Sequence, residues 1–254
     1  MMFARAVSVI GYKNSGKTRV VEALVRELTD RGHRVGTLKH TAEDVLLDTP
    51  GKDTWRHREA GSRATAILHG RGSAFFIDRF FTVNEAVSRL GGLDFVVLEG
   101  FKSLETMAKI IVPREAGEIE GLSNGLEIVM AALAEGGLRA QDDVPVVSLD
   151  GGGELADIVE ARAFPMLPGL DCHGCGYEDC LGLGRAILAG EASVDKCVGF
   201  APGFTLRVDG EVVPLGPFVQ DVTRGVVLGL VKSFKGVEAP SRVELEFETG
   251  GKDG

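Results

Sequence analysis

The stretch Gly11-Tyr12-Lys13-Asn14-Ser15-Gly16-Lys17-Thr18 decides the fold of this 254-residue chain. It matches the pattern G-x-x-x-x-G-K-[ST] at every fixed position and lies between a hydrophobic run and an amphipathic stretch. In such a phosphate loop the backbone N–H groups and the N-terminus of the following helix attract phosphate oxygens. Lys17 is expected to neutralise the β- and γ-phosphates, and the Thr18 hydroxyl to bind Mg2+. The sequence therefore predicts a nucleotide site that includes Gly11, Asn14, Ser15, Gly16, Lys17, Thr18 and Arg19.

Short β-branched runs alternate with amphipathic stretches around this loop. Apolar residues recur at helical spacing over 17–31, which predicts the first helix, and further helices are expected over 54–60 and 154–162. The candidate strands are 6–10, 35–39, 64–68, 74–77, 95–98, 109–112, 128–131 and 144–148. This alternation is typical of an α/β fold of the P-loop NTPase type, with a mostly parallel sheet and flanking helices.

An acidic residue at the end of a neighbouring strand is needed to hold Mg2+ beside a phosphate loop. Glu99 ends the apolar run 95–98 and precedes Gly100, so it is the candidate, and Lys17 and Glu99 are the expected catalytic residues. Asp94 precedes the same run and either caps the loop or takes part in catalysis. Asp48 and Asp53 are either further site carboxylates or parts of a solvated turn.

The composition is that of a globular protein. Apolar residues make up 44% and charged residues 26% of the chain, which argues against disorder. The 37 acidic and 28 basic residues give a net charge of -9, which disfavours a nucleic-acid binder because phosphate neutralisation needs a surplus of Lys and Arg. No apolar run approaches the ~18 to 20 residues of a membrane span, and no signal-peptide pattern opens the chain. We expect a cytoplasmic protein without a nucleic-acid or membrane partner.

All four cysteines lie in one short stretch, spaced Cys172-x2-Cys175-x4-Cys180-x16-Cys197. Four thiolates complete the ligand shell of a 4Fe-4S cluster or of a structural Zn2+. A zinc ribbon usually has two C-x2-C knuckles and this stretch has one, so the spacing favours the cluster, with zinc or free thiols as alternatives. His173 is expected to be a loop residue. A short helix around 186–190 would cover one side of the cluster.

Two prolines interrupt the periodicity over 164–169 and suggest a boundary. The predicted parts are a nucleotide-binding domain over 1–163, a cluster domain over 164–203 and a small unit over 204–254. That last unit is expected to hold a hairpin over 205–213 that turns at Asp209 and Gly210, then a helix over 218–232, then a strand and a frayed tail over 249–254. The helix is predicted to turn inward Val219, Val222, Val226 and Leu230, and the strand is marked by Val243, Leu245 and Phe247.

Over about 6–159 the chain resembles the molybdopterin-guanine dinucleotide biosynthesis adaptor family, MobB. The resembling segments are 11–18, Leu38-Lys39-His40-Thr41, Asp48-Thr49-Pro50-Gly51-Lys52-Asp53-Thr54, Glu59-Ala60-Gly61, Leu98-Glu99-Gly100-Phe101-Lys102 and Ala108-Lys109-Ile110. The resemblance implies a dimeric GTP-binding domain that assists a MobA-like molybdenum cofactor guanylyltransferase. It also implies that Lys17 and Thr18 contact the triphosphate and Mg2+, that Glu99 lies near the γ-phosphate, and that the site is lined by Lys39, His40 and Asp53.

Two departures from the family pattern bear on this resemblance. Ala42 and Glu43 stand where the family commonly has histidines. The run 128–134 lacks the aspartate that would pair with the guanine edge, and Asp142 or Asp143 are the available substitutes. No motif identifies an arginine finger in this sequence. Because such an arginine raises the rate of hydrolysis by ~10^3 to 10^5, any GTP hydrolysis is expected to be slow.

The cysteine stretch resembles the four-cysteine iron-sulfur domain of Rnf-type subunits and corrinoid iron-sulfur proteins. The matching residues are 167–172, Cys175-Gly176, Cys180, Ala186-Ile187, Gly190-Glu191 and Cys197. The first functional hypothesis is thus a GTP-binding protein of molybdenum or tungsten cofactor maturation, with Mg2+ and a 4Fe-4S cluster. The alternatives are an NTP-gated iron-sulfur electron-transfer protein and a regulatory nucleotide-binding module with structural zinc.

Overall fold

The computed structural model describes residues 3–41, 45–132, 144–200, 204, 206–208, 211–213, 215–237, 240 and 243–246. Some sequence predictions lie outside these residues. One is the frayed tail over 249–254. The others concern Ala42 and Glu43, which replace the family's histidines, Asp142 and Asp143, which were candidates to bind guanine, Asp209 and Gly210 in the hairpin turn, and Phe247 in the last strand.

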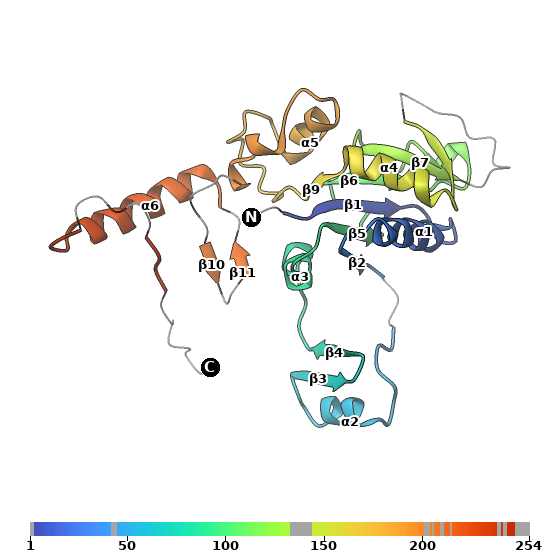
Figure 1. Cartoon of the computed structure of the whole chain (residues 1–254), viewed down its shortest axis with the longest axis horizontal. Coiled ribbons are helices and arrows are strands. Elements are labelled where there is room, and N and C mark those ends of the chain that lie inside the picture. Colours follow the sequence, from blue (N-terminus) through green and yellow to red (C-terminus); the bar gives the residue numbers. More distant parts are fainter. Residues whose placement is uncertain are drawn as a thin grey trace.

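A seven-stranded sheet forms the centre of the molecule (Figure 1). Its order is β2-β5-β1-β6-β7-β8, with all neighbours parallel, and a short β9 pairs antiparallel with β1. The strands are β1 Arg5–Ile10, β2 Val35–Lys39, β5 Phe95–Glu99, β6 Ala108–Ile111, β7 Glu127–Ala132, β8 Val146–Ser148 and β9 Phe164–Pro165. The predicted α/β fold is confirmed.

Helices cover the sheet because their apolar faces have the right spacing. In α1, Lys17–Asp30, the side chains of Val20, Val21, Leu24 and Leu28 are buried, and Gly32 ends the helix at a positive φ of 87°. α4, Gly152–Arg162, packs beside α1 against the same core. On the other face, Val83 and Val87 of α3, Val83–Leu90, pack against a buried cluster that includes Val96 and Leu98. The sequence analysis missed α3, although Thr82 and Glu85 form a capping box at its start.

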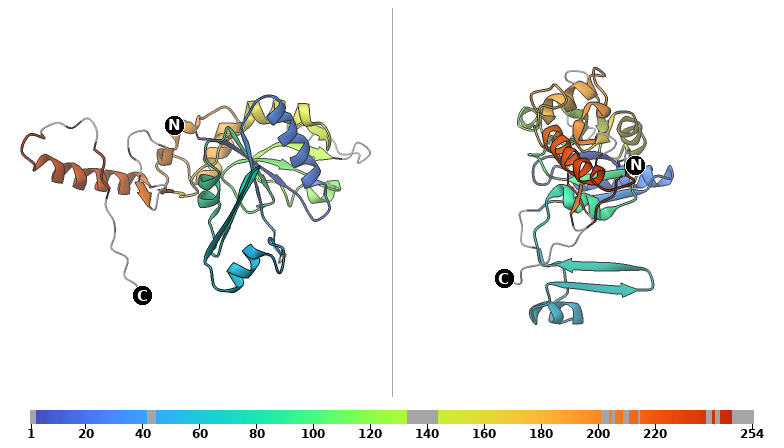
Figure 2. Two further views of the ribbon diagram at one scale, coloured as in Figure 1. Left: turned by 60° about the horizontal axis from the view of Figure 1, so that its bottom comes forward. Right: turned by 90° about the vertical axis from the view of Figure 1, so that its left-hand side faces the viewer.

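Strands β3, Ala64–His69, and β4, Gly72–Ile77, do not join the main sheet. They pair antiparallel with His69 opposite Gly72, so only Gly70 and Arg71 separate the strands. A loop this short folds the second run back on the first, and the prediction that both belong to the parallel sheet was wrong for this reason. With α2, Asp53–Glu59, they form a unit that projects from the sheet (Figures 1 and 2).

The cysteine segment packs against the amino-terminal edge of the sheet. Leu167 N–H donates to Thr106 O, just before β6, at 2.7 Å, and Arg185 Nε donates to Asn124 O, just before β7, at 2.8 Å. Leu183 of α5, Cys180–Leu188, and Cys197 belong to the same buried core as the sheet. The helix predicted around 186–190 is present but begins earlier, at Cys180, where the Asp179 side chain caps it. Short 3-10 turns follow at η2 Val194–Lys196 and η3 Val198–Phe200, and an earlier one, η1, spans Ala116–Glu118.

The last part of the chain extends away from the sheet (Figures 1 and 2). It contains the predicted hairpin, β10 Leu206–Val208 with β11 Glu211–Val213, and the helix α6, Pro217–Lys232. The four side chains of α6 that were predicted to face inward are exposed, because no other described element covers that face: Val219, Val222, Val226 and Leu230. Residues 243–246 form no strand, so the predicted last strand is not found in the described residues.

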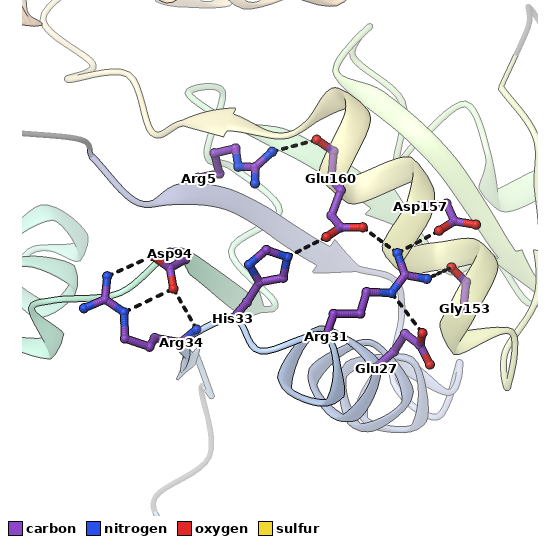
Figure 3. A network of polar contacts seen from close by, with 9 residues as sticks. All are labelled: Arg5, Glu27, Arg31, His33, Arg34, Asp94, Gly153, Asp157 and Glu160. Carbon is purple, nitrogen blue, oxygen red and sulfur yellow. Dashed lines mark hydrogen bonds and ion pairs between the residues drawn. The ribbon is translucent and has the colours of Figure 1, made fainter.

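An ion-pair network joins the end of α1 to α4 (Figure 3). Arg31 pairs with Glu27, with Asp157 at 2.7 Å and with Glu160. His33 Nε2 lies 2.5 Å from Glu160 Oε1, and Arg5 donates to the Glu160 backbone oxygen at 2.6 Å. The hydrogen bond with His33, followed by that from Arg31, lowers the pKa of the Glu160 carboxyl. The network fixes the two helices against each other at the amino-terminal edge.

We predict that Glu160→Gln lowers the free energy of unfolding by about 1 to 2 kcal/mol at pH 7, because it removes the charge that pairs with Arg31 and His33. The effect is not larger because the Glu160 side chain is 29% exposed, and solvent screening weakens its ion pairs. A carboxyl with a lowered pKa stabilises the fold above its unfolded pKa and loses this effect as the pH falls through its folded pKa. The difference between variant and parent should therefore shrink in urea unfolding below pH 4. Glu22→Gln, at an exposed position of α1, is the control. An equal loss at both pH values would contradict the prediction.

Candidate functional site

The loop between β1 and α1 has the backbone that a phosphate loop requires. Asn14 and Gly16 have positive φ angles of 60° and 96°. A Cβ on Gly11 would lie 2.4 Å from Ser15 Oγ and 2.5 Å from Val112 O, so only glycine fits there. The Ser15 hydroxyl is buried and has no hydrogen-bond partner in the described residues. The loop thus leaves a buried polar group next to the space where a phosphate would bind.

Glu99 brings together residues that the sequence analysis assigned to the site. The Thr18 hydroxyl donates to Glu99 Oε1 at 2.9 Å, and Lys39 Nζ lies 2.9 Å from the same oxygen. The Glu99 side chain is only 12% exposed. Thr18, at the start of α1, and Glu99, at the end of β5, supply a hydroxyl and a carboxylate, which are oxygen ligands that Mg2+ prefers. These contacts place Thr18, Lys39 and Glu99 in one cluster at the carboxyl end of the sheet.

His40 and Gly100 complete the edge of this cluster. His40 N–H donates to Glu99 O at 3.0 Å, and Gly100 N–H donates to Val9 O at 2.9 Å. The His40 ring lies 5.3 Å from the ring of Phe101. Gly100 has a φ of 95° and a Cβ there would lie 3.4 Å from His40 O, so glycine allows the chain to turn close to β2.

Further cations surround Lys17. Its ammonium donates to Tyr12 O at 2.6 Å, within the loop itself. Burial lowers the pKa of Lys17, and the positive charges of Lys102, Lys39 and Arg114 lower it further, against the raising effect of Glu99. Lys102 Nζ lies 3.6 Å from the centre of the Tyr12 ring. The loop is therefore surrounded by several cations before any ligand is bound.

Arg114 is held in place by a buried carboxylate. Arg114 Nε donates to Glu118 Oε1 at 2.7 Å and its backbone N–H to Glu118 Oε2 at 2.9 Å. Its Nη1 reaches Lys13 O at 3.5 Å, the limit of a hydrogen bond. The Glu118 side chain is 9% exposed, and its bonds to Arg114 lower the pKa of the carboxyl. Glu118 thus fixes the guanidinium against the phosphate loop.

Lys109 fixes the loop that carries Lys102. It lies in β6, is 1% exposed, and its ammonium donates to Lys102 O at 3.3 Å. Burial lowers the pKa of Lys109, while Glu127 and Glu105 oppose this effect. A buried ammonium needs such a partner, so the loop after Glu99 is tied to the sheet beneath it.

Other predicted residues lie elsewhere. The Arg19 guanidinium forms an ion pair with the carboxylate of Asp150, which follows β8 in the chain. Asp53 begins α2 in the projecting unit, and no described contact joins it to the Glu99 cluster. Asp48 accepts hydrogen bonds from Thr49 N–H at 2.8 Å and Thr54 Oγ1 at 3.0 Å, as a turn residue does.

Asp94 has a structural role at the opposite end of β5 from Glu99. It binds the Arg34 guanidinium at 2.9 and 3.1 Å and accepts the Arg34 backbone N–H at 2.8 Å, as Figure 3 shows. These bonds hold the pKa of the Asp94 carboxyl well below its usual range. The alternative in which Asp94 caps the loop is the one that the contacts favour.

The sequence analysis did not assign Lys102, Arg114 or Glu118 to the site. Lys102 closes the stretch that begins at Glu99, so its place could have been suspected. Arg114 and Glu118 are four residues apart in a loop after β6, and this spacing alone does not say that they lie beside β1. Only the pairing of β1 with β6 brings them to the loop.

The four cysteines form a second site at the other edge of the sheet. Cys172, Cys175, Cys180 and Cys197 line one cavity, with Pro168, Leu183 and Val198 among its apolar walls. Burial raises the pKa of Cys180 and of Cys197. None of the four forms a disulfide. Within the described residues, no three His, Cys, Asp or Glu side chains lie close enough to share one metal ion. The cavity thus gathers the four thiols that the sequence analysis assigned to one site.

Two family models match the chain. The model described as "Molybdopterin guanine dinucleotide synthesis protein B" matches residues 6–135, and the one described as "Putative Fe-S cluster" matches residues 167–198. A "Putative molybdopterin-guanine dinucleotide biosynthesis adapter protein" of Methanocaldococcus jannaschii is 31% identical over 249 residues, which are 96% of this chain and 97% of the relative. The similarity to that relative therefore extends through the cysteine segment and α6.

The bacterial relatives are similar in sequence over less than half of this chain. The Escherichia coli "Molybdopterin-guanine dinucleotide biosynthesis adapter protein" is 33% identical over 110 residues, 41% of this chain and 62% of that protein. The crystal structure of Bacillus subtilis MobB aligns with a TM-score of 0.55 at 23% identity, covering 63% of this chain and 98% of that chain. This structure supports the fold. None of the helices in the described ranges is long and apolar enough to cross a membrane.

We predict that Lys17→Ala weakens the binding of a nucleoside triphosphate by about 10- to 100-fold, because it removes one charge-assisted hydrogen bond worth about 1.5 to 3 kcal/mol. The measurement is a titration with a fluorescent nucleotide. Arg26→Ala, at an exposed position on the same helix, should bind as the parent does. Equal affinities for both variants would show that nucleotides bind elsewhere.

Proposed function

Because this chain belongs to the molybdopterin-guanine dinucleotide biosynthesis adapter (MobB) family, we propose that it binds GTP with Mg2+ and serves a MobA-like molybdenum cofactor guanylyltransferase. The observation that supports this proposal most directly is the contact between Thr18 and Glu99 beside the phosphate loop. Thr18 and Glu99 would hold the Mg2+, and Lys17, Lys39 and Lys102 would neutralise phosphate oxygens. The bound ion would neutralise phosphate charge as well.

An adapter role fits this site better than rapid hydrolysis. The Arg114 guanidinium reaches the loop at Lys13 O, and Glu118 holds it by several bonds. An arginine finger must be free to move onto the charge that develops in the transition state. Arg114, tied to a buried carboxylate, would favour binding over turnover. We therefore propose weak or absent intrinsic GTPase activity, with the bound nucleotide presented to the partner enzyme.

The test combines binding with function. Titrations with GTP and ATP, each with and without Mg2+, should show preference for GTP and a loss of the Mg2+ effect in Thr18→Val. With a MobA-like guanylyltransferase and molybdopterin cofactor, the chain should increase the yield of the guanine dinucleotide, and Lys17→Ala should not. Equal binding of ATP would contradict the guanine specificity. No effect of the parent chain on the yield would contradict the adapter role.

We propose a 4Fe-4S cluster for the cysteine cavity, in a cytoplasmic protein where the thiols stay reduced. A zinc site brings four sulfurs to ~2.3 Å from one ion, whereas a cluster binds each cysteine through a different iron and so spaces the sulfurs more widely. The gathering of four thiols in one cavity, and the match of residues 167–198 to the model described as "Putative Fe-S cluster", support the cluster. Cys172, Cys175, Cys180 and Cys197 would hold a cluster that can take up or release an electron.

Iron analysis tests this assignment. After anaerobic purification we expect about four irons and four sulfides per chain. Cys197→Ser should lower the iron content most, because this cysteine is buried in the shared core, while the exposed Cys172→Ser should lower it less. Ser193→Ala, at a position between α5 and η2, serves as a control with full iron. Stoichiometric zinc with no iron would exclude the cluster.

We also propose a homodimer formed through the projecting unit. Strands β3 and β4 expose Leu68 (75%) and Phe75 (70%), and Phe80 after β4 is fully exposed. Apolar surface of this kind on a strand pair outside the main sheet is typical of a protein interface. The unit lies within residues 6–135, which the MobB family model matches. Phe75→Glu should therefore separate the two copies at this interface.

A further inference from the structure

The Tyr12 side chain is the point where three loops at the carboxyl edge of the sheet meet. Lys102, in the loop after β5, places its ammonium 3.6 Å from the centre of the Tyr12 ring. Arg114, in the loop after β6, places its guanidinium carbon 5.8 Å from the same centre. A Cβ on Gly121, in that second loop, would lie 2.9 Å from the Tyr12 hydroxyl oxygen, so the end of the ring lies close to this backbone. One aromatic side chain of the phosphate loop thus contacts two cations from two other loops.

The Tyr12 ring is the contact that orders the end of the Lys102 side chain. The Lys102 backbone is fixed from the sheet, because the buried Lys109 ammonium donates to Lys102 O at 3.3 Å. The Lys102 ammonium forms no ion pair with a carboxylate in the part of the chain that the structure describes. A lysine side chain has many rotamers, and a contact that selects one of them reduces the entropy lost when a ligand binds. Without the ring, the charge of Lys102 would be spread over a wide volume.

Lys102 lies near the lysine that binds the end of a triphosphate. In a phosphate loop the backbone N–H groups hold the α- and β-phosphates, and the lysine of the motif reaches the β- and γ-phosphates. Lys17 is that lysine, and its ammonium donates to Tyr12 O at 2.6 Å, so it belongs to the same turn of the loop as the ring. Among the neighbouring positive charges, that of Lys102 lowers the pKa of Lys17 most. A cation at this place adds most to the binding of a terminal phosphate, which a nucleoside diphosphate lacks.

We propose that Tyr12 is a positioning residue that holds Lys102 for the γ-phosphate, and so makes the site prefer a nucleoside triphosphate to a diphosphate. This proposal rests on the nucleotide binding proposed above. The face of an aromatic ring attracts a cation, and the contact uses one side of the ammonium. The remaining N–H groups of Lys102 stay available for phosphate oxygens. Arg114 does not depend on the ring in this way, because Glu118 already holds its guanidinium.

Two other roles for an aromatic side chain in this loop give a different binding pattern. The Tyr12 ring is 37% exposed, which leaves part of it accessible to a ligand. A ring that stacked on the base would affect GTP and GDP equally, because both carry the same base. A ring that only stabilised the loop would also affect both, because the loop backbone holds the phosphates that they share. The ratio of the two affinities therefore separates positioning of Lys102 from either of these roles.

Titrations of the full-length chain with GTP and with GDP, each in the presence of Mg2+, test the proposal. Tyr12→Leu removes the ring and should weaken GTP binding by about three- to tenfold, and GDP binding by less than about twofold. Tyr12→Phe keeps the ring, and both of its affinities should stay within about twofold of the parent. Lys102→Met should lower the preference for GTP at least as much as Tyr12→Leu does, because it removes the charge itself. Lys232→Met, at an exposed lysine of α6, is the matched control and should change neither affinity.

A double-mutant cycle shows whether Tyr12 acts through Lys102. In the Lys102→Met background the ring has no ammonium to hold, so adding Tyr12→Leu should change GTP affinity by less than about twofold. Additive losses in the double variant would overturn the proposal, because Tyr12 would then act by another route.

The remaining outcomes separate this proposal from the proposed function. Equal losses of GTP and GDP binding in Tyr12→Leu would overturn the positioning role and would leave nucleotide binding standing. Parental GTP affinity in Tyr12→Leu would do the same. A parent chain that binds neither nucleotide would overturn the proposed function, and the role of Tyr12 with it.

Discussion

The parallel pairing of β1 with β5 on one side and β6 on the other is the constraint on which the rest of the structure depends. It aligns Val9 with Glu99 and Ile10 with Ile111, so three loops leave the sheet at the same edge. Thr18 can then reach Glu99, 81 residues away, and Arg114 can reach the phosphate loop. Parallel strands, whose carboxyl ends share an edge, make this possible with residues that are far apart in the sequence.

The same pairing separates the two sites. The phosphate loop follows the carboxyl end of β1, whereas the cysteine segment packs at its amino end, where β9 pairs with Arg5 and Ala6. A six-residue strand is roughly 20 Å long. Within one chain the cluster cavity and the nucleotide are thus at opposite edges of the sheet. This arrangement gives no support to direct gating of an electron by the nucleotide, and it fits an adapter with a separate iron-sulfur unit.

Features set by local sequence could be predicted, and those set by distant contacts could not. The phosphate loop, most strands and the four cysteines follow from spacing, and Glu99 follows from its place at a strand end. The role of Arg114 depends on Glu118 and on the neighbouring strand, and the separate β3–β4 pair depends on a two-residue loop. In α6, apolar spacing predicted the helix correctly but not its exposure, because the spacing marks an apolar face and does not say whether another element covers it.

The charge distribution explains how an acidic chain can attract a nucleotide. The whole chain carries -9, yet Lys17, Lys39, Lys102 and Arg114 surround the loop, opposed there by Glu99 and by the carboxylate that holds Arg114. A local positive field draws small anions to the loop, while the net negative charge repels long polyanions. This charge distribution fits the proposed nucleoside triphosphate better than a long polyanion. Burial is the main cause of the lowered pKa of Lys17, and the neighbouring cations lower it further, so a bound phosphate would offset a repulsion among these side chains.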